Sequence, residues 1–361
     1  MWNSIIKEDM QNISTGIVPW NILNGQTILI TGATGMIPSY MIFALLYQNE
    51  FVPEFHCTIL AQLRSLQKAE KVFGDFLHRR DFHVIQADIT EPIELNERID
   101  YIVHGASPAS PQLFTETPVD TIRPNILGTN YLLELACVKD VKGFLLLSSG
   151  EVYGQIQDGT IITEETMGVV QQLNMRNSYA ESKRMAEMLC RAYMEQYGIP
   201  TKIARISHTY GPTISFENDR RVFSEFVQNI IANENIVLKS NGEAIRPFCY
   251  LADAVEALFL VLLKGEAGQA YNMCNDNCCY TIRNLANILV GLFPERGLKV
   301  MQEERTVGDT YTEGSSSQKC FVDNARLRSL GWYPKVDVEV GFRRMIEAIE
   351  EKTGNSSQRY Y

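Results

Sequence analysis

An apolar run, a glycine-containing turn and an apolar helix-forming stretch follow one another without interruption between residues 27 and 46. The run TILIT is typical of a buried strand, and the stretch from Met36 to Leu46 is typical of a buried helix. A strand that passes through a tight turn directly into a helix opens a β–α–β unit, whose next strand lies parallel to the first. This order restricts the chain to a small set of folds.

Further short apolar runs follow, separated by helix-forming segments, and they read CTILA, FHVIQA, YIVHGA, FLLLSS and KIARIS. Strands that alternate with helices in this way predict an α/β fold, namely a Rossmann-like, doubly wound parallel sheet with helices on both faces. The chain has 361 residues, which is enough for this domain and for a smaller lobe beside it.

The alternation ends near Ser207, and irregular and helical segments predominate beyond it. Ser315 to Ser317 indicate a flexible loop there. The expected organisation is an N-terminal extension packed on the body, a Rossmann domain, a smaller mixed substrate-binding lobe and a tail. These parts cover residues 1–25, then 26–206 with about 244–268, then 207–243 with 269–355, and finally 356–361.

Composition argues against several classes of partner. The chain carries 43 acidic and 33 basic side chains, a net charge of -10, and no basic run that would follow a nucleic-acid backbone. Its longest apolar stretch, Ala257 to Leu263, is far shorter than the roughly 20 residues that span a bilayer. No basic-then-apolar signal pattern opens the chain. We expect a cytoplasmic protein without a membrane partner, and the cysteines, which lack C-x-x-C spacing, predict neither disulfides nor a metal site.

The turn after the first strand predicts a dinucleotide site. Its glycines let the backbone approach a pyrophosphate held at the helix N-terminus, although glycine also serves simply to make tight turns. The expected contacts are Gly32, Thr34, Gly35, Met36 and Ile37. Pro38 stands where the third glycine of the usual pattern would be. Proline is tolerated in the first helical turn, so the question that it raises is how closely the helix packs on the strand.

The segment after the second strand run reads AQLRS and lacks the acidic residue that usually binds the ribose. Arg64 can pair with a 2′-phosphate there, or can simply be solvated, so both NAD and NADP remain open as the cofactor. Asp88 and Ile89 follow the third strand run and are expected to contact the adenine. An aspartate at such a position can also cap a turn.

Tyr179 and Lys183 are four residues apart in a helix-forming segment, so their side chains emerge on one face. A nearby ammonium favours the phenolate, as does an oxidised nicotinamide, and we expect the pKa of the phenol to fall from its ordinary value of about 10. Tyr179 is then a general base for a substrate hydroxyl. Ser149, at the end of the FLLLSS strand, can share the moving proton. Glu151 adds a carboxylate to the same crevice, or pairs with a neighbouring cation or helix N-terminus.

A series of ordered motifs between residues 26 and 350 resembles the extended short-chain dehydrogenase/reductase family of nucleotide-sugar enzymes. The motifs are TGATGMIP, ASPASP, SSGEVYG, RNSYAESKRMAE, RISHTYGP, IRPFCYLADAVEAL, YNM and LGWYPKV. Within that family, ASPASP, DRRVFSEF and RNSYAESKR are most similar to UDP-glucuronate decarboxylases. The resemblance implies a bound nicotinamide that oxidises the sugar at C4 and later returns the hydride. It also implies a homodimer formed by the helix around Thr121 to Val138 and the helix that bears Tyr179.

The same resemblance assigns roles by motif position. It makes Ser149, Tyr179 and Lys183 the catalytic trio and Glu151 an additional acid/base. Ala106, Tyr179 and Lys183 join the cofactor contacts. The residues implied to bind the substrate, through its diphosphate or a sugar carboxylate, are Ser107, His208, Arg221 and Arg246. A planar guanidinium suits both of these anions, although either arginine can instead serve an internal ion pair.

Gly150 leaves the reaction open. The related 4,6-dehydratases place an aspartate at this position to protonate the departing hydroxyl, and the decarboxylases usually place a serine there. Decarboxylation of a UDP-glucuronate-like substrate is the first expectation, because a β-keto acid loses carbon dioxide without a strong acid beside it. The alternatives are a 4,6-dehydratase, a 4-epimerase and an NADPH-dependent 4-keto-sugar reductase. A non-catalytic dinucleotide-binding protein is disfavoured, since such proteins commonly lose the Tyr/Lys pair.

Overall fold

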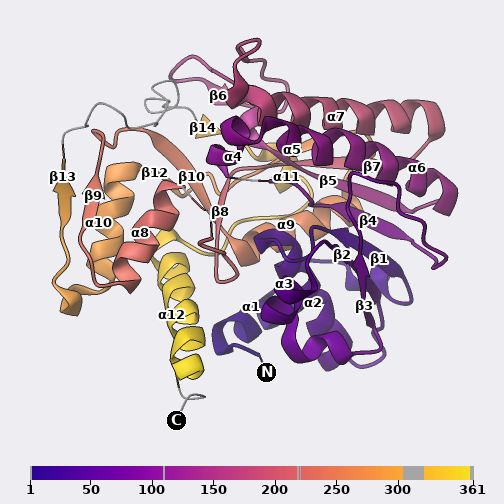
Figure 1. Cartoon of the computed structure of the whole chain (residues 1–361), viewed down its shortest axis with the longest axis horizontal. Helices are drawn as coiled ribbons and strands as arrows, with labels where there is room; N and C mark the ends of the chain where they lie inside the picture. Colours follow the sequence, from indigo (N-terminus) through magenta and orange to yellow (C-terminus); the bar gives the residue numbers. More distant parts are fainter. Residues whose placement is uncertain (1, 109, 218, 220, 304–320, 358–361) are drawn as a thin grey trace.

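The computed structural model describes residues 2–108, 110–217, 219, 221–303 and 321–357, with side chains as far as residue 352. The expected loop at Ser315 to Ser317 lies outside these residues. Within them, the largest sheet has seven strands, all parallel (Figure 1). In spatial order they are β11 (Ala270–Met273), β7 (Thr201–Ile206), β5 (Gly143–Ser149), β4 (Tyr101–His104), β1 (Thr27–Thr31), β2 (Thr58–Leu63) and β3 (Phe82–Gln86). The predicted doubly wound α/β fold is confirmed.

Helices cover both faces of this sheet (Figure 1). The helices α2 (Met36–Phe51) and α9 (Leu251–Lys264) pack against one face, and α6 (Thr129–Lys139) and α7 (Ser178–Tyr197) pack against the other. Along β1, Ile28 and Ile30 face the first pair, whereas Leu29 faces the second, and none of the three is exposed. This double burial explains why the strands appear in the sequence as continuous apolar runs.

The long apolar stretch that the sequence places at Ala257 to Leu263 lies inside α9, nearly all of which is buried in the core. Within the described ranges, no helix combines the length and the apolar composition needed to cross a bilayer.

Smaller sheets and helices form a second layer beside the large sheet (Figure 1). The strand pairings are β12 (Cys279–Thr281) with β10 (Ile245–Tyr250) and β8 (His208–Tyr210), β13 (Val300–Gln302) with β9 (Ile236–Leu238), and β14 (Phe321–Val322) with β6 (Ile161–Ile162). The helices of this layer are α8 (Val222–Ile231), α10 (Ile282–Leu292) and α12 (Val338–Ser357). Apolar residues of α8, α10 and α12 share one core with α2 and α9.

Two strands belong to other sheets than the expected domain boundaries imply. Strand β10 pairs with β8 and β12, although residues from about 244 were expected in the Rossmann domain. Strand β11 adds to the edge of the large sheet beside β7, although residues from 269 were expected in the smaller lobe. A four-residue strand carries too little periodicity to be recognised from sequence, and here the neighbouring β7 supplies the pairing.

The N-terminal extension contains a helix, α1 (Ser4–Ser14), which packs against α2, α9 and α12. Its Asp9 is buried and accepts hydrogen bonds from the hydroxyls of Tyr40 and Tyr250, the latter at 2.6 Å. Arg344 of α12 donates to the same carboxylate at 2.6 Å. One carboxylate therefore joins α1 to α2, β10 and α12. Its hydrogen bonds to two hydroxyls and one guanidinium offset the cost of burying the carboxylate.

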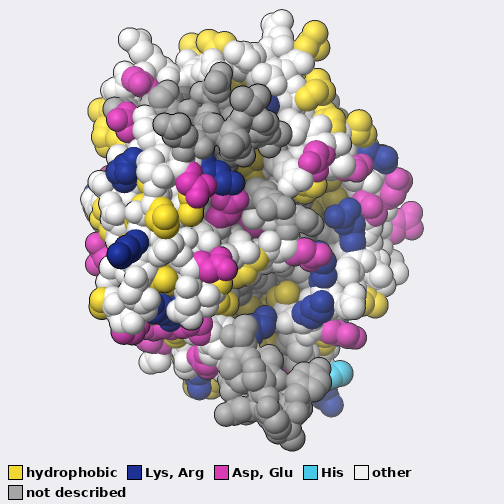
Figure 2. Space-filling view, turned by 60° about the vertical axis from the view of Figure 1, so that its left-hand side comes forward, with side chains coloured by type: hydrophobic (Ala, Val, Ile, Leu, Met, Phe, Trp, Pro, Cys, Tyr) yellow, Lys and Arg dark blue, Asp and Glu magenta, His cyan; other side chains and the backbone are white. Residues whose placement is uncertain are grey.

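Shorter helical segments complete the described chain. They are η1 (Trp20–Leu23), α3 (Leu66–Phe73), η2 (Gly74–His78), α4 (Pro111–Glu116), α5 (Pro118–Arg123), the π-helical η3 (Pro124–Gly128), η4 (Gly150–Tyr153), η5 (Met175–Asn177), η6 (Pro294–Arg296) and α11 (Ala325–Arg328). Figure 2 shows acidic and basic side chains interspersed over one face of the molecule, rather than gathered by sign.

Candidate active site

The candidate site lies where the carboxyl ends of neighbouring parallel strands meet. The glycine turn follows β1, the segment Gly105 to Ser107 follows β4, and Ser149 ends β5. These three strands are adjacent in the order β5-β4-β1, so the segments that follow them share one edge. Ligands of open α/β sheets bind at this edge, because the strand order reverses there and leaves a crevice.

The glycine turn after β1 depends on the absence of side-chain atoms. Gly32 has φ +66°, and a Cβ there would lie 2.7 Å from the Cα of Ala106. Gly35 caps α2, which begins at Met36, so the free N–H groups of the first helical turn open onto this turn. A dinucleotide diphosphate fits such a cradle, since the helix N-terminus favours an anion and no side chain obstructs the approach. The residues present therefore fit the cofactor that the sequence predicted.

Pro38 raised the question of whether α2 packs closely on the sheet, and the structure answers it. Pro38 is buried, and a Cβ on Gly105 would lie only 2.7 Å from its Cγ. Helix α2 lies close to the segment after β4 because Gly105 has no side chain that would overlap Pro38. Thr31 organises the same segment, since its hydroxyl oxygen accepts the N–H groups of Gly105 at 3.2 Å and Ala106 at 3.3 Å.

At the adenosine end the structure brings Arg64 and Asp88 near one another. Asp88 accepts the N–H and the hydroxyl of Thr90, both at 2.9 Å, and so caps a turn. The Thr90 N–H bond and the charges of Arg64 and Arg123 hold the pKa of Asp88 below its ordinary value. Arg64 is exposed, whereas Ile89 beside Asp88 is buried.

Tyr179 is buried at the start of α7, with 8% of its surface exposed. The Phe114 ring of α4 stacks on it with centroids 4.3 Å apart and planes 1° from parallel. Burial raises the pKa of Tyr179 to about 12, and the nearby Glu151 charge raises it too, while the nearby Ser149 hydroxyl and the charge of Arg221 lower it. The structure therefore joins Tyr179, Ser149 and Glu151 in one site, as the sequence proposed.

The direction of that pKa shift corrects the sequence-based expectation, which was a lowered value. Lys183 is almost completely buried, and its ammonium donates to the backbone carbonyl of Leu147 at 2.8 Å. It lies 5.7 Å from the centroid of the Tyr179 ring. Burial lowers the pKa of Lys183 to about 8. The protein side chains alone thus keep the phenol protonated, because desolvation outweighs the lowering effects of the Ser149 hydroxyl and the Arg221 charge.

Glu151 has the cationic partner that the simpler interpretation foresaw. Arg176 of η5 approaches its two carboxylate oxygens at 3.3 and 3.4 Å. The same guanidinium lies 5.2 Å from the centroid of Phe114, the ring that stacks with Tyr179. Sequence analysis missed Arg176 and Phe114. Arg176 stands three residues before Tyr179 and so had a signal in its motif, whereas Phe114 had none.

The residues expected to bind the substrate gather on the smaller lobe side. His208 is half-buried, and desolvation together with the charges of Arg246 and Arg221 lowers its pKa to about 3. Arg221 forms a two-pronged ion pair with Asp219, with contacts of 3.0 and 2.7 Å. Arg246 donates to the carbonyl of Ile245 at 2.8 Å. Ser107 follows β4 of the large sheet, and its hydroxyl donates to the Pro108 carbonyl.

The described cysteines are all free thiols. Among the residues that the structure places, no group of three or more histidine, cysteine or acidic side chains could hold a metal ion.

Comparisons with known proteins identify the family. Residues 28–274 match the model of the NAD dependent epimerase/dehydratase family. UDP-glucuronic acid decarboxylase 6 of Arabidopsis thaliana is 34% identical over 334 residues, which cover 91% of this chain and 90% of that protein. The dTDP-D-glucose 4,6-dehydratase of Homo sapiens is 29% identical over 346 residues, which cover 93% and 94% respectively.

Solved structures share the fold. The UDP-glucuronic acid 4-epimerase from Bacillus cereus, in complex with UDP-glucuronic acid and NAD, aligns with a TM-score of 0.74 at 19% identity and covers 91% of this chain and 100% of its own. A dTDP-glucose 4,6-dehydratase from Bacillus anthracis in complex with NAD has a TM-score of 0.73 at 20% identity, with 91% and 98% covered. The family is NAD dependent, so NAD is the cofactor of this chain. The chain is an enzyme of the NAD dependent epimerase/dehydratase family.

Proposed function

We propose that this enzyme oxidises a nucleotide sugar at C4 and decarboxylates a UDP-glucuronate-like substrate. The observation that carries the proposal is the buried Tyr179, whose pKa responds to the nearby Ser149 hydroxyl and whose helix also carries Lys183 one turn further on. This is the arrangement that the removal of a proton from a secondary hydroxyl requires. The similarity to UDP-glucuronic acid decarboxylases over 91% of the chain supports the choice of substrate.

The glycine turn after β1 would hold NAD, which would supply a reversible acceptor for the C4 hydride. Tyr179, as the phenolate, takes the proton of the C4 hydroxyl while the Ser149 hydroxyl donates to the same oxygen. Once the C5–C6 bond has broken and carbon dioxide has left, C5 takes a proton from a water molecule, which the Glu151 carboxylate, paired with Arg176, orients. Tyr179 finally returns its proton to the C4 oxygen. Arg221 and Arg246 hold the nucleotide diphosphate or the sugar carboxylate, a task to which guanidinium groups are suited, and His208 binds the substrate beside them.

Gly150 favours decarboxylation over dehydration. It precedes Glu151 in η4, and a Cβ there would meet only the carbonyl oxygen of Ile206 at 3.8 Å. Glycine has no group that could protonate a departing C6 hydroxyl, as a dehydratase requires. A β-keto acid needs no such donor, because the carbanion left by carbon dioxide is delocalised onto the C4 ketone.

We also propose that Arg64 does not serve to bind the 2′-phosphate of NADP. Arg64 could accept a 2′-phosphate, but its charge already faces the Asp88 carboxylate, which would repel one. A reductase that consumes NADPH would depend on Arg64, and this residue therefore separates the two functions.

The remaining assignments are proposals of the same kind. The Rossmann part holds the cofactor and the smaller lobe holds the sugar nucleotide. A homodimer would cover apolar side chains that the helices α5, α6 and α7 expose, such as Val138 at 80% and Met188 at 62%. The free thiols suit the reducing cytoplasm.

The test is incubation of the purified enzyme with UDP-, dTDP-, GDP- and CDP-sugars, with and without added NADPH, followed by mass spectrometry of the products. A loss of about 44 mass units from UDP-glucuronate, without net consumption of NAD, supports the proposal. A loss of about 18 units from a neutral hexose substrate indicates a dehydratase, and an unchanged mass with inverted stereochemistry indicates an epimerase. Reduction only in the presence of NADPH indicates the reductase.

A further inference from the structure

Behind the catalytic end of β5 lies a chain of buried polar side chains that the proposed chemistry does not use. Helix α7 carries Lys183 and Glu187 one turn apart, and these two residues hold consecutive residues of β5. The Lys183 ammonium donates to the Leu147 carbonyl at 2.8 Å, and the Ser148 hydroxyl donates to Glu187 at 2.5 Å. Glu187 therefore fixes the strand immediately before Ser149.

Arg205 of β7 holds Glu187 from the other side. It stands beside Ser148 in the register of the two strands. Its guanidinium donates to the Glu187 carboxylate in a two-pronged pair, with contacts of 3.1 Å from Nε and 2.7 Å from Nη2. Both side chains are largely buried, with 16% of Arg205 and 11% of Glu187 exposed. Such a fork fixes orientation as well as distance.

The third guanidinium nitrogen of Arg205, Nη1, contacts residues that follow Ser149 in the chain. Its Nη1 donates to the Tyr153 hydroxyl at 3.0 Å and to the Glu164 carbonyl at 2.8 Å. Tyr153 ends the short helix η4, which contains Gly150 and Glu151, and its own hydroxyl donates to Asn272 at 2.6 Å. The catalytic segment, residues 149–151, is thus held at Ser148 on one side and at Tyr153 on the other.

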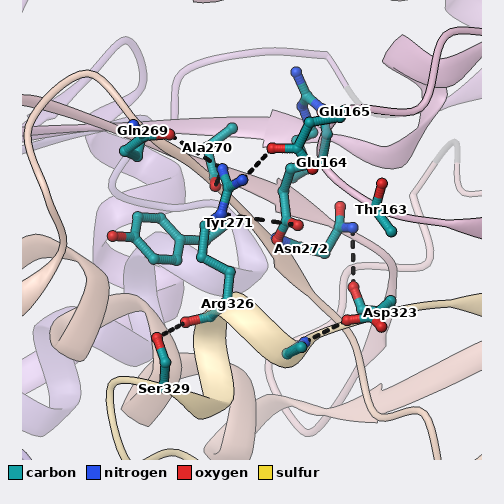
Figure 3. Close-up of polar contacts among 12 residues, drawn as sticks. Thr163, Glu164, Glu165, Gln269, Ala270, Tyr271, Asn272, Asp323, Arg326 and Ser329 are labelled. Carbon is teal, nitrogen blue, oxygen red and sulfur yellow. Dashed lines mark hydrogen bonds and ion pairs between the residues drawn. The ribbon is translucent and has the colours of Figure 1, made fainter.

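Asn272 carries the chain onward into the region shown in Figure 3. Its side-chain amide donates to the backbone carbonyls of Ile162 at 3.3 Å and Asp323 at 3.0 Å, and its own N–H donates to Glu164 at 2.8 Å. Arg326 binds the Ala270 carbonyl at 2.9 Å from the α11 side (Figure 3). The polar chain therefore links the catalytic segment to β11 and to the C-terminal part of the molecule.

We propose that Glu187 and Arg205 are positioning residues that set the placement of the catalytic segment, with Tyr153 as the contact through which Arg205 acts. A buried ion pair contributes little net stability, because desolvation of both charges offsets their attraction. Its more distinctive effect is to fix geometry, and here both ends of the catalytic segment are held. The Glu187 charge also favours the buried ammonium of Lys183. The kinetic consequence rests on the proposed function, whereas the placement itself does not.

The experiment compares Tyr153→Phe and Glu187→Gln with Glu195→Gln, a control on the same helix whose exposed glutamate pairs with Arg191. Single-turnover reduction of bound NAD by UDP-glucuronate is followed at the nicotinamide absorbance. We expect it to slow about 10-fold in Tyr153→Phe and about 100-fold in Glu187→Gln, since a misplacement of about 1 Å can cost 100-fold. KM and the Kd for NAD should stay within about twofold. Glu187→Asp should recover part of the rate, and hydrogen exchange of residues 150–154 should accelerate in the slow variants.

Rates equal to that of Glu195→Gln in both variants would overturn the inference. So would a loss of rate that is matched by an equal loss of NAD affinity and thermal stability, because that pattern indicates a general structural role. If the unmodified enzyme reduces its NAD with no sugar of the panel, the proposed function fails. Hydrogen exchange then decides the inference alone, and unchanged exchange at residues 150–154 in Glu187→Gln would refute it.

Discussion

Gly32 and Tyr179 represent two ends of one site that are built in different ways. At the cofactor end, room for the ligand comes from missing atoms, since a Cβ on Gly32 would overlap Ala106. At the chemical end, the properties come from atoms that are present but desolvated, since burial raises the pKa of Tyr179 and lowers that of Lys183. The positions of the glycines in the sequence indicate where the backbone needs room. The protonation states of Tyr179 and Lys183 depend on burial, which their spacing in the sequence does not specify. Each of the following variants changes one end and tests whether the other is affected.

Tyr179→Phe should have the largest effect at the chemical end. Without the phenol no group accepts the proton of the C4 hydroxyl, and we expect sugar oxidation to slow by about 1,000-fold while the Kd for NAD changes little. The measurement is the rate of NAD reduction, with calorimetric titration of NAD beside it. Tyr197→Phe, at the exposed end of the same helix, is the control and should behave as the unmodified enzyme. Turnover that survives in Tyr179→Phe would refute the catalytic assignment.

Gly32→Ala should be the most harmful change at the cofactor end. It adds steric overlap to a backbone with φ +66°, and we expect a loss of NAD affinity of about 100-fold and of about 1–3 kcal/mol in the free energy of unfolding. Gly25→Ala separates the two causes, because Gly25 has φ +72° but no atom near the added Cβ. Titration calorimetry and thermal unfolding of both variants measure the difference. Equal NAD binding in the two would contradict the steric argument.

The pH dependence of activity tests whether the bound cofactor lowers the pKa of Tyr179, which the protein side chains alone leave raised. A phenol must lose its proton to act as a base, so activity rises with pH through the pKa of Tyr179. The positive nicotinamide should bring that rise from about 12 toward neutral pH. Activity should fall again near pH 8, where Lys183 loses its charge. In both the rising and the falling part of the pH profile, the single-turnover rate should change about tenfold per pH unit.

Lys183→Arg keeps the positive charge at every accessible pH. We expect its overall rate to be lower but the fall above pH 8 to disappear. A fall that persists unchanged in this variant would show that another group causes it.

Gly150→Ser should have the smallest effect. The space beside Gly150 is open and its φ is ordinary, so we expect the free energy of unfolding to change by less than about 0.5 kcal/mol and decarboxylation to continue. Gly154→Ser is the contrast, because Gly154 has φ +68° and an added Cβ would lie 2.5 Å from the Val169 carbonyl oxygen. Denaturant unfolding and mass spectrometry of the products provide the comparison. Marked destabilisation by Gly150→Ser would show that glycine is required there for packing.

Sequence reasoning succeeded where a local pattern corresponds to a local structure. Each apolar run that was identified before residue 207 is a strand of the large sheet, and the glycine turn stands between β1 and α2 as expected. It failed where one segment depends on a distant one. Strand β11 needs β7 as its partner, and Phe114 stacks on Tyr179 across 65 positions of the chain, a separation for which a single sequence provides no signal.

The amino-acid sequence by itself determined the order of the strands and helices, the glycine turn and the helical spacing of Tyr179 and Lys183, because each is encoded within a few neighbouring residues. Only the tertiary structure decided that Tyr179 has a raised pKa, that Pro38 packs against a glycine, and that Glu187 pairs with Arg205. The physical reason is that burial and ion pairing depend on which elements come together in space, and elements far apart in the chain set the local dielectric environment of each charge.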